Sequence, residues 1–432
     1  MDHRGDDPRS ALCNNDINPV AADQFSRSPA RLRPASLNMS AISRLQAFGQ
    51  SVWLDVSSEG VTDLELLRQL IEEDGISGMV CGRIHVVSND KRGKSPVAEH
   101  AAALLPRPGN ELATERQITS RDVQDIADLF HSRYALTAGH DGLVDVELPP
   151  DVLRDPKQMV EAARRLWTAI GRRNILVSIP GSEANVPAIR DLVTAGVNIR
   201  VTSIYTDEHY CEAFDAYCAG LEARVAKGYP IWHVAFVASF AVAALDRQID
   251  AALQSLRPPA SRRAASVNSL AGQGGIACAT VIHRRGLMHA ACERFASLAK
   301  QGAQPPRLMW ELGSDATVRG VTKYVEPLVR VGTVCSMPLA AIESYRGHDV
   351  SGQDRNPILL ELEFVSAMNI VIRLQKAGVD IEAIARQLQA AADIRHQPPP
   401  MRDRFDAQDD RGRHPGVRKP PCQYGMRLSM SF

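Results

Sequence analysis

Eight short apolar runs rich in Val and Ile, separated by longer segments of helical pattern, most limit how this 432-residue chain can fold. Such runs are typical of parallel strands that crossover helices bury on both faces. Eight parallel strands can close on themselves. The sequence therefore predicts an α/β fold, a parallel (β/α)8 TIM barrel. The runs begin at Gln50, Ile76, Leu143, Asn174, Asn198, His233, Arg307 and Thr333.

The segments between the runs carry helix start and stop signals. Thr62 followed by Glu65 matches a capping box, and Gly75 ends that helix. The pair Asp155 and Pro156 predicts a second helix start, with a stop at Gly171. A third helix is expected from Thr206 to about Gly228. Alternation of strand and helix thus continues through the middle of the chain.

Composition changes at both ends of the chain. Residues 1–38 mix Asp, Arg, Pro and Asn without an apolar period, and 394–432 contain a charged stretch after three prolines, so both are predicted to be disordered extensions. Residues 39–393 form the predicted barrel. The intervals 87–142 and 241–306 are too long for simple connections and must hold extra helices, with a loop around Pro258 to Ala265.

Charge and cysteine usage narrow the class of partner. Hydrophobic residues make up 44% of the chain and the formal net charge is zero, which argues against nucleic acid or an anionic membrane as a partner. The eight cysteines show no Cys-x-x-Cys spacing and are expected to be reduced. We find no signal-peptide pattern and no apolar stretch of membrane-spanning length, so a cytoplasmic location is predicted.

Polar residues late in the apolar runs are the candidate site. Catalytic groups of such barrels project from the carboxyl ends of the strands. These positions hold two carboxylates and three hydroxyls, namely Asp55, Glu147, Ser178, Thr202 and Ser239. A pair of carboxylates at one barrel mouth can transfer protons, although neighbouring amides can also satisfy such side chains without any chemistry.

Several segments within residues 45–391 resemble the bacterial transaldolase family. GQSVWLD at Gly49 is similar to the family's first strand, LIEEDGISG at Leu70 to its first helix and second strand, and AGVNIRVTSIYTDEHY at Ala195 to its fifth unit. The likeness extends through YVEPLV at Tyr324, CSMP at Cys335 and AGVDIEAIARQL at Ala377. The resemblance implies a barrel of sugar-phosphate metabolism in the pentose phosphate pathway.

The resemblance also implies a reaction for which this chain lacks a required residue. Transaldolases transfer a dihydroxyacetone unit between sugar phosphates through an imine formed by a strand-four lysine. In NILVSIP, Ser178 stands where the family has that lysine. A hydroxyl cannot form an iminium, so the family activity is expected to be lost or to fall by many orders of magnitude.

Three further positions depart from the family's pocket. Gly82 replaces an asparagine after strand two, Arg200 replaces an asparagine in strand five, and Ala244 replaces the phosphate-binding arginine after strand six. Loss of that guanidinium weakens bidentate phosphate recognition. Asp55, Glu147, Thr202 and Ser239 match the family's acid/base carboxylates and positioning hydroxyls.

Other candidate groups favour structural interpretations. Lys323 follows strand seven and is the alternative amine, but KYVEPLV reads as a helix with a solvated lysine; Lys157 and Lys227 also lie in helical patterns. The histidine spacings give no metal motif, so no metal site and no cofactor are predicted. GQGG at Gly272 to Gly275 reads as a glycine-weakened helix rather than a phosphate loop. Cys211 and Cys218 read as core thiols.

Three functions remain open on the sequence alone. The first is a transaldolase-like protein with impaired transfer activity. The second is a non-catalytic barrel that binds a sugar phosphate or a protein partner as a regulator, with a homo-oligomer also possible. The third is a reaction of Asp55 and Glu147 without imine formation, such as proton abstraction next to a carbonyl.

Overall fold

The computed structural model describes residues 40–57, 63–85, 118–256, 269–313, 318–348 and 357–395. The predictions of disorder for residues 1–38 and 394–432 fall almost wholly outside these ranges. Thr62 and the loop expected around Pro258 to Ala265 also lie outside the described residues.

The predicted barrel is confirmed. Each of the eight apolar runs contains a strand, and all neighbouring strands pair in parallel, with β1 bonded to both β2 and β9 so that the sheet closes. A two-residue strand β3 (Ile118–Thr119), which the sequence did not predict, pairs with the end of β2. The barrel strands are β1 Ser51–Asp55, β2 Gly78–His85, β4 Leu143–Glu147, β5 Ile175–Pro180, β6 Ile199–Ile204, β7 Phe236–Phe240, β8 Arg307–Glu311 and β9 Val334–Pro338.

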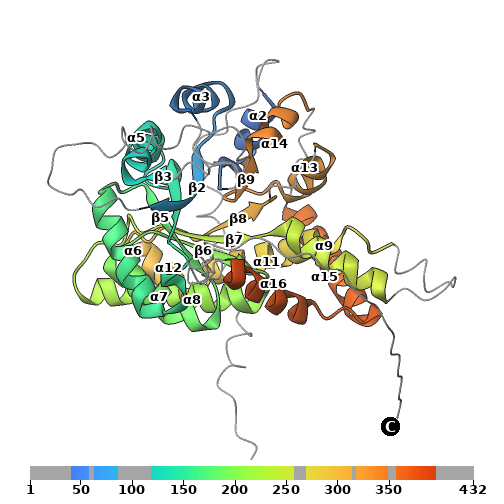
Figure 1. Cartoon of the computed structure of the whole chain (residues 1–432). Coiled ribbons are helices and arrows are strands. Elements are labelled where there is room, and N and C mark those ends of the chain that lie inside the picture. Colours follow the sequence, from blue (N-terminus) through green and yellow to red (C-terminus); the bar gives the residue numbers. More distant parts are fainter. Residues whose placement is uncertain are drawn as a thin grey trace, which may run out of the picture. The chain divides into compact units, whose positions relative to one another are not determined.

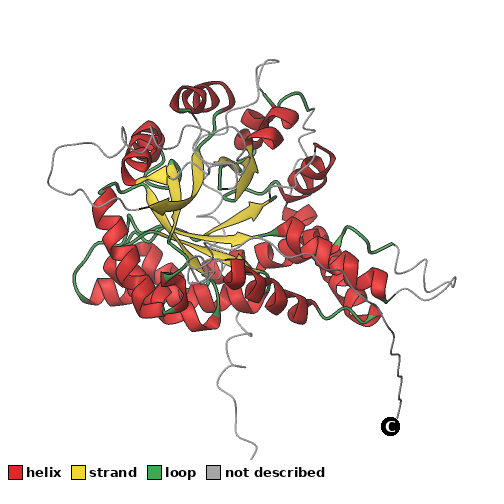
Figure 2. Ribbon diagram, viewed as in Figure 1, coloured by secondary structure: helices red, strands yellow, loops and turns green. Residues whose placement is uncertain are grey.

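Helices surround the strands, as Figures 1 and 2 show. Their apolar faces meet the outer face of the sheet in one large core that runs around the barrel. The helices are α2 Ala41–Ala47, α3 Leu64–Gln69, α5 Ser120–Leu136, α6 Pro156–Ile170, α7 Val186–Ala195, α8 Asp207–Ala226, α9 Val242–Ser255, α11 Gly274–Ala290, α12 Glu293–Lys300, α13 Val318–Val325, α14 Leu339–Tyr345, α15 Pro357–Ala377 and α16 Ile381–Arg395.

Helix boundaries largely follow the sequence signals. The cap of α3 was misplaced by one residue, because the Asp63 carboxylate accepts the Glu65 backbone N–H and begins the helix there. Gly75 ends the π-helical turn that follows α3, with φ +74° in the left-handed region. Asp155 and Gly171 cap α6, and Thr206 caps α8, as predicted. The two long intervals contain α5 in the first and α9, α11 and α12 in the second.

The inside of the barrel is layered. A second apolar cluster, separate from the outer core, fills its middle and includes Trp53, Val80, Leu143, Leu176 and Met309. Side chains alternate along each strand, so residues two positions further along the same face continue this layer upward. Most of these positions are polar, and they include Asp55, Asp145, Ser178 and Glu311. The apolar layer therefore separates two polar ends.

The amino-terminal end of the barrel is closed by Arg307, Ser51 and Asp141, here called the lower cluster. The Arg307 guanidinium lies 3.6 Å from the Asp141 carboxylate and donates to the Ser51 hydroxyl at 2.7 Å, while that hydroxyl donates to Asp141 at 2.6 Å. Trp53 Nε1–H donates to the same carboxylate at 2.9 Å. Arg307 also donates to the carbonyls of His140, Gly332 and Thr333.

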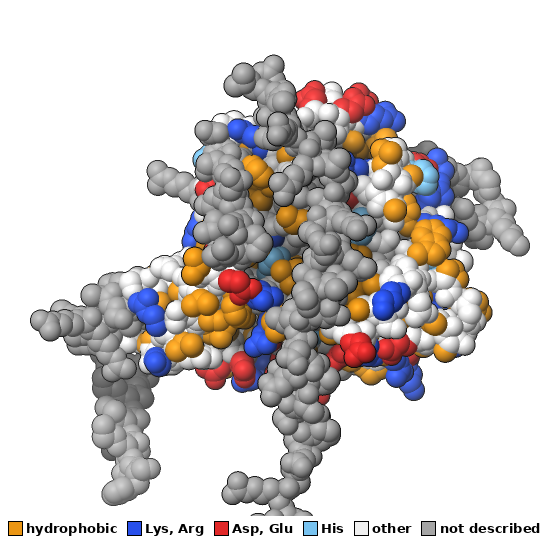
Figure 3. Space-filling model, turned by 180° about the vertical axis from the view of Figure 1, so that it is seen from behind, with side chains coloured by type: hydrophobic (Ala, Val, Ile, Leu, Met, Phe, Trp, Pro, Cys, Tyr) orange, Lys and Arg blue, Asp and Glu red, His pale blue; other side chains and the backbone are white. Residues whose placement is uncertain are grey.

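The surface of the described part mixes both charge signs. In the face seen in Figure 3, Lys and Arg side chains stand among Asp and Glu, which fits the balanced charge of the chain. Among the helices of the described ranges, none is both long and apolar enough to cross a lipid bilayer.

Candidate active site

Arg200 occupies the carboxyl end of the barrel. Its side chain is 3% exposed and contacts three carboxylates. Nη2 lies 3.0 Å from Asp145 and 3.4 Å from Glu147, and Nη1 lies 2.9 Å from Glu311. These residues come from β6, β4 and β8, so the closed sheet brings them together. Together with Ser178 they form what we call the upper cluster.

Ser178 bridges the cation and the buried carboxylate. Its hydroxyl lies 2.8 and 2.9 Å from the two oxygens of Asp145, and it accepts a hydrogen bond from Arg200 Nε at 3.0 Å. Register explains the proximity, because Ser178 pairs with Glu147 on one side and with Arg200 on the other. The hydroxyl proton is thus directed at Asp145 and the oxygen is covered by Arg200.

Burial and the shared cation have opposite effects on the pKa values of Asp145 and Glu311. Asp145 is fully buried, and this burial raises its pKa to about 7 against the opposing effect of Arg200, with Glu147 adding to the rise. Burial likewise raises the pKa of Glu311, again opposed by Arg200. For Arg200, burial works against the charge, but the carboxylates outweigh it and raise its pKa. The upper cluster can therefore hold an exchangeable proton near neutral pH.

Asp55 and Ser239 line the same mouth. Asp55 accepts the Ser57 backbone N–H at 3.0 Å, the Ser57 hydroxyl at 2.6 Å and the Ser336 hydroxyl at 3.1 Å. Ser239 is fully buried and lies 3.5 Å from Arg200 Nη1 and 3.3 Å from the Met309 sulfur. Asp55 is thus satisfied by hydroxyls and an amide, while Ser239 contacts the upper cluster directly.

The other predicted pocket positions contribute less. Thr202 is half-buried in β6 opposite Pro180, and none of the described side-chain hydrogen bonds joins it to Arg200. Gly82 has φ +74°, and a Cβ there would lie 3.0 Å from Ser57 Cα, so the turn that holds Asp55 packs directly on this glycine. Ala244 lies on α9 and packs against the outer core.

Sequence reasoning missed two members of the upper cluster, Asp145 and Glu311. Glu311 is the last residue of β8, just as Asp55 and Glu147 are the last residues of β1 and β4, so the same criterion would have found it. Asp145 lies two residues before Glu147 and therefore on the same face of β4. A carboxylate inside an apolar run was the available signal.

The nine described strands contain no lysine. Lys157, Lys227, Lys300, Lys323 and Lys376 lie within or at the ends of helices, whereas Lys91, Lys94 and Lys419 lie outside the described ranges. Lys323 donates to Asp246 at 2.6 Å and to the Tyr324 hydroxyl at 3.2 Å. Partial burial disfavours its charge, but these hydrogen bonds prevail and raise its pKa, which keeps the amine protonated and non-nucleophilic.

Two of the three glycines of GQGG lie in a helix, as expected, and they form the start of α11. Gly274 and Gly275 are its first two residues. The Gly275 N–H donates to Asp246 at 2.9 Å and the Gly272 N–H donates to Asp250 at 2.8 Å. Carboxylates of the chain therefore occupy the N–H groups that an anion would use at this helix start.

The last described helix, α16, reaches the mouth as well. The Gln389 side-chain amide on α16 lies 3.2 Å from the carbonyl of Gly181, just after β5, and 3.2 Å from that of Ser203 in β6. Ser203 has φ +60°, a left-handed conformation that is unfavourable for a residue with a Cβ. Gln389 thus spans the ends of the strands that carry Ser178 and Arg200.

A closed parallel barrel with ionisable groups gathered at the carboxyl ends of its strands defines the class, a (β/α)8 TIM barrel. The particular family follows from comparison, because residues 62–395 match the family described as Transaldolase/Fructose-6-phosphate aldolase. The chain belongs to this family.

Curated relatives support the same family assignment. A transaldolase of Saccharopolyspora erythraea is 31% identical over 356 residues, which cover 81% of this chain and 93% of the relative. A transaldolase of Thiobacillus denitrificans is 30% identical, with 81% and 94% covered, and one of Trichodesmium erythraeum is 27% identical, with 80% and 90% covered.

Proposed function

We propose that this protein is a transaldolase-like barrel of sugar-phosphate metabolism whose imine-based dihydroxyacetone transfer is lost or strongly impaired. One observation carries the proposal: a hydroxyl at Ser178, bonded to Asp145 and covered by Arg200, stands where the family resemblance implies the nucleophilic lysine. A carbonyl substrate meets no amine in the described strands.

Charge balance gives a physical reason why Arg200 accompanies Ser178. Buried carboxylates need a cation nearby, because an unpaired buried charge is strongly unfavourable. With a lysine at position 178, its ammonium would serve Asp145. With serine there, the guanidinium of Arg200 takes over this pairing at 3.0 Å. Serine at position 178 and arginine at position 200 together move the positive charge from strand β5 to strand β6.

Borohydride reduction in the presence of fructose 6-phosphate tests the proposal. We expect no covalent adduct on the wild-type chain, because reduction traps only an imine. An adduct would contradict the proposal, and peptide mapping would then identify the amine, with Lys323→Met, Lys91→Met and Lys94→Met as the variants to examine.

Restoring the amine sharpens the test. Ser178→Lys alone places an ammonium beside Arg200, so the double variant Ser178→Lys/Arg200→Asn should give more adduct and more transfer activity. We expect partial recovery, because Ala244 offers no guanidinium for a phosphate. Ser239→Lys is the matched control, with an amine in the same mouth but on β7. Full activity in Ser178→Lys would show that the other departures matter little.

A second candidate is a non-catalytic barrel that binds a sugar phosphate. The observation in its favour is that Arg200 already has three carboxylate partners, which leaves the mouth organised without substrate. A sugar phosphate that raises the melting temperature without turnover would support this function. Conversion of the ligand by proton transfer, dependent on Asp145, would instead favour chemistry without an imine.

A further inference from the structure

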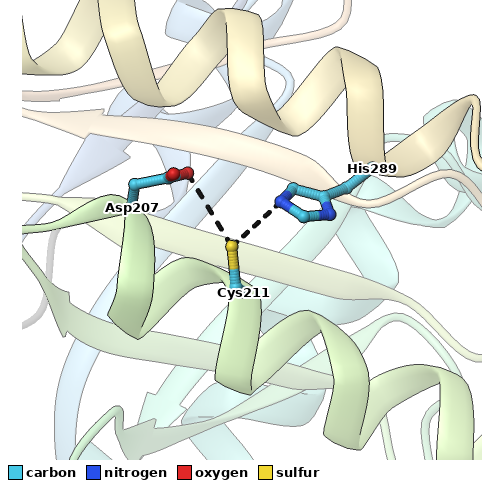
Figure 4. A group of neighbouring side chains, drawn as sticks. All are labelled: Asp207, Cys211 and His289. Carbon is cyan, nitrogen blue, oxygen red and sulfur yellow. Dashed lines mark hydrogen bonds between the residues drawn. The ribbon is translucent and has the colours of Figure 1, made fainter. Parts of the chain in front are cut away.

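A second group of reactive side chains lies outside the barrel, between α8 and α11. Asp207 and Cys211 are one helical turn apart at the start of α8, and His289 lies in the last turn of α11. The Cys211 sulfur is 2.9 Å from His289 Nε2 and 3.8 Å from Asp207 Oδ1. Figure 4 shows all three side chains pointing toward one another.

Their chemistry matches that of a metal-binding site. Thiolate, imidazole and carboxylate are the three ligand types that zinc takes from proteins. The three ligand atoms lie within 4.8 Å of one another. In a tetrahedral zinc site, ligand atoms are about 3.5 Å apart by the usual bond lengths. The sulfur–nitrogen separation must therefore widen slightly and the sulfur–oxygen separation shorten, which side-chain rotation can supply.

The surroundings fix the imidazole and leave one side accessible. The His289 ring lies 5.5 Å from the Phe214 ring and 6.1 Å from the Tyr210 ring, between centroids, so its position is held by packing. All three ligand residues are half-buried, so an ion can enter and keep a water as its fourth ligand. Arg285 Nε lies 3.5 Å from Asp207 Oδ2, whereas the oxygen next to the Cys211 sulfur is Oδ1, so this contact leaves Oδ1 for an ion.

We propose that Asp207, Cys211 and His289 bind a zinc ion that links α8 to α11. A soft sulfur ligand beside an imidazole selects zinc over magnesium and calcium, which prefer oxygen ligands. The arrangement does not fit a nucleophilic cysteine, because the carboxylate bonds the thiol, whereas in Cys–His catalysis it orients the imidazole. Spacing motifs missed the site because its ligands come from helices 78 residues apart.

Cobalt substitution and zinc titration of the full chain test the proposal. After chelator treatment, we expect one equivalent of zinc to bind and Co²⁺ to give a thiolate-to-metal charge-transfer band. Cys211→Ser should abolish that band, and Cys211→Ser and His289→Gln should each weaken zinc binding by at least about tenfold. Zinc should raise the melting temperature of the wild type but not of Cys211→Ser.

Cys292→Ala is the matched control, since Cys292 is also half-buried and free but lies outside the cluster. It should keep both the cobalt band and the zinc affinity. Absence of the band in the wild type, or its persistence in Cys211→Ser, would overturn the proposal. If Cys211→Ser does not fold, Asp207→Asn and His289→Gln decide, because unchanged zinc affinity in both would equally refute the site.

Discussion

The two ends of the barrel are built from the same three residue types and have different electrostatic outcomes. In each, a buried arginine, a serine hydroxyl and an aspartate bond to one another: Arg307, Ser51 and Asp141 below, and Arg200, Ser178 and Asp145 above. The lower arginine completes its bonds with backbone carbonyls, and Arg133 lies 3.9 Å from Asp141. The upper arginine completes its contacts with more carboxylates.

This difference makes the lower cluster a structural element and the upper cluster a proton-binding site. Below, one carboxylate has two cations nearby, so its charge is compensated. Above, three carboxylates share one cation, and burial raises the pKa of Asp145 to about 7. Residues at the amino-terminal face of such barrels serve stability and those at the carboxyl face serve function, in line with this division.

Removing each arginine is the strongest test of the comparison. Arg200→Met leaves three carboxylates without a cation, and we expect it to lower the free energy of unfolding by about 3–5 kcal/mol at pH 8. Arg307→Met leaves one carboxylate that keeps its Ser51 and Trp53 donors, so a loss of about 1–3 kcal/mol is expected. Urea denaturation of both variants measures the difference, and a larger loss in Arg307→Met would break the comparison.

The pH dependence of stability should reveal Asp145. Its pKa is raised in the folded state, so between about pH 4 and pH 7 the folded chain binds more protons than the unfolded chain, and stability falls as the pH rises. A shift from 3.8 to about 7 corresponds to at most about 4 kcal/mol over that window. Urea denaturation at pH 4 and at pH 8 measures this change. Between the two pH values, the free energy of unfolding of the wild type should fall by this amount more than that of Asp145→Asn.

Asp128→Asn serves as the control for that measurement. The hydrogen bond from Arg172 lowers the pKa of Asp128, so its contribution has the opposite sign and is lost as the pH falls. Equal pH profiles for the wild type and Asp145→Asn would mean that Asp145 is ionised throughout.

Substitution of one glycine at each end of the barrel compares the rigidity of the two ends. Gly142, just before β4, and Gly82 both have φ +74°, so the backbone strain of an added Cβ is matched. At Gly142 the Cβ would lie 2.4 Å from the Tyr134 backbone nitrogen, against 3.0 Å from Ser57 Cα at Gly82. We expect Gly142→Ala to cost about 3 kcal/mol and Gly82→Ala about 1–2 kcal/mol. Equal midpoint shifts in urea would indicate an upper rim as rigid as the lower.

The smallest expected effect concerns the bridging hydroxyls. Ser178→Ala and Ser51→Ala should each cost about 1 kcal/mol, the usual net value of a hydrogen bond. Ser178→Ala should also move the pH dependence of stability to higher pH, because the hydrogen bond from Ser178 lowers the pKa of Asp145. If Ser51→Ala shifted the pH dependence instead, the proton-binding carboxylate would lie in the lower cluster and the comparison would be wrong.

Sequence patterns predicted the strands well because burial on both faces leaves a continuous apolar run. They also singled out Asp55, Glu147, Ser178 and Ser239, which sit late in those runs and which the structure places at the carboxyl end of the barrel. They did not reveal the upper cluster as a unit, because the contacts of Arg200 with Asp145 and Glu311 depend on which strands face one another across the closed barrel. The cap at Asp63 instead of Thr62 shows the same limit locally, since either side chain could accept the first free N–H group.

The group of Asp207, Cys211 and His289 was invisible to spacing rules for a related reason. Motif searches detect ligands on one segment, while this group forms where two helices pack. Cys218 is buried in the outer core as predicted, but Cys211, seven residues earlier, faces His289.

The contacts of Gln389 with the ends of β5 and β6 couple the last described helix, α16, to the mouth of the barrel. A ligand that pushes these two strand ends apart would have to stretch or release the amide, so occupancy of the mouth would be transmitted to α16 near the end of the described chain. An amide-exchange change in α16 on adding a sugar phosphate would therefore report on occupancy of the mouth.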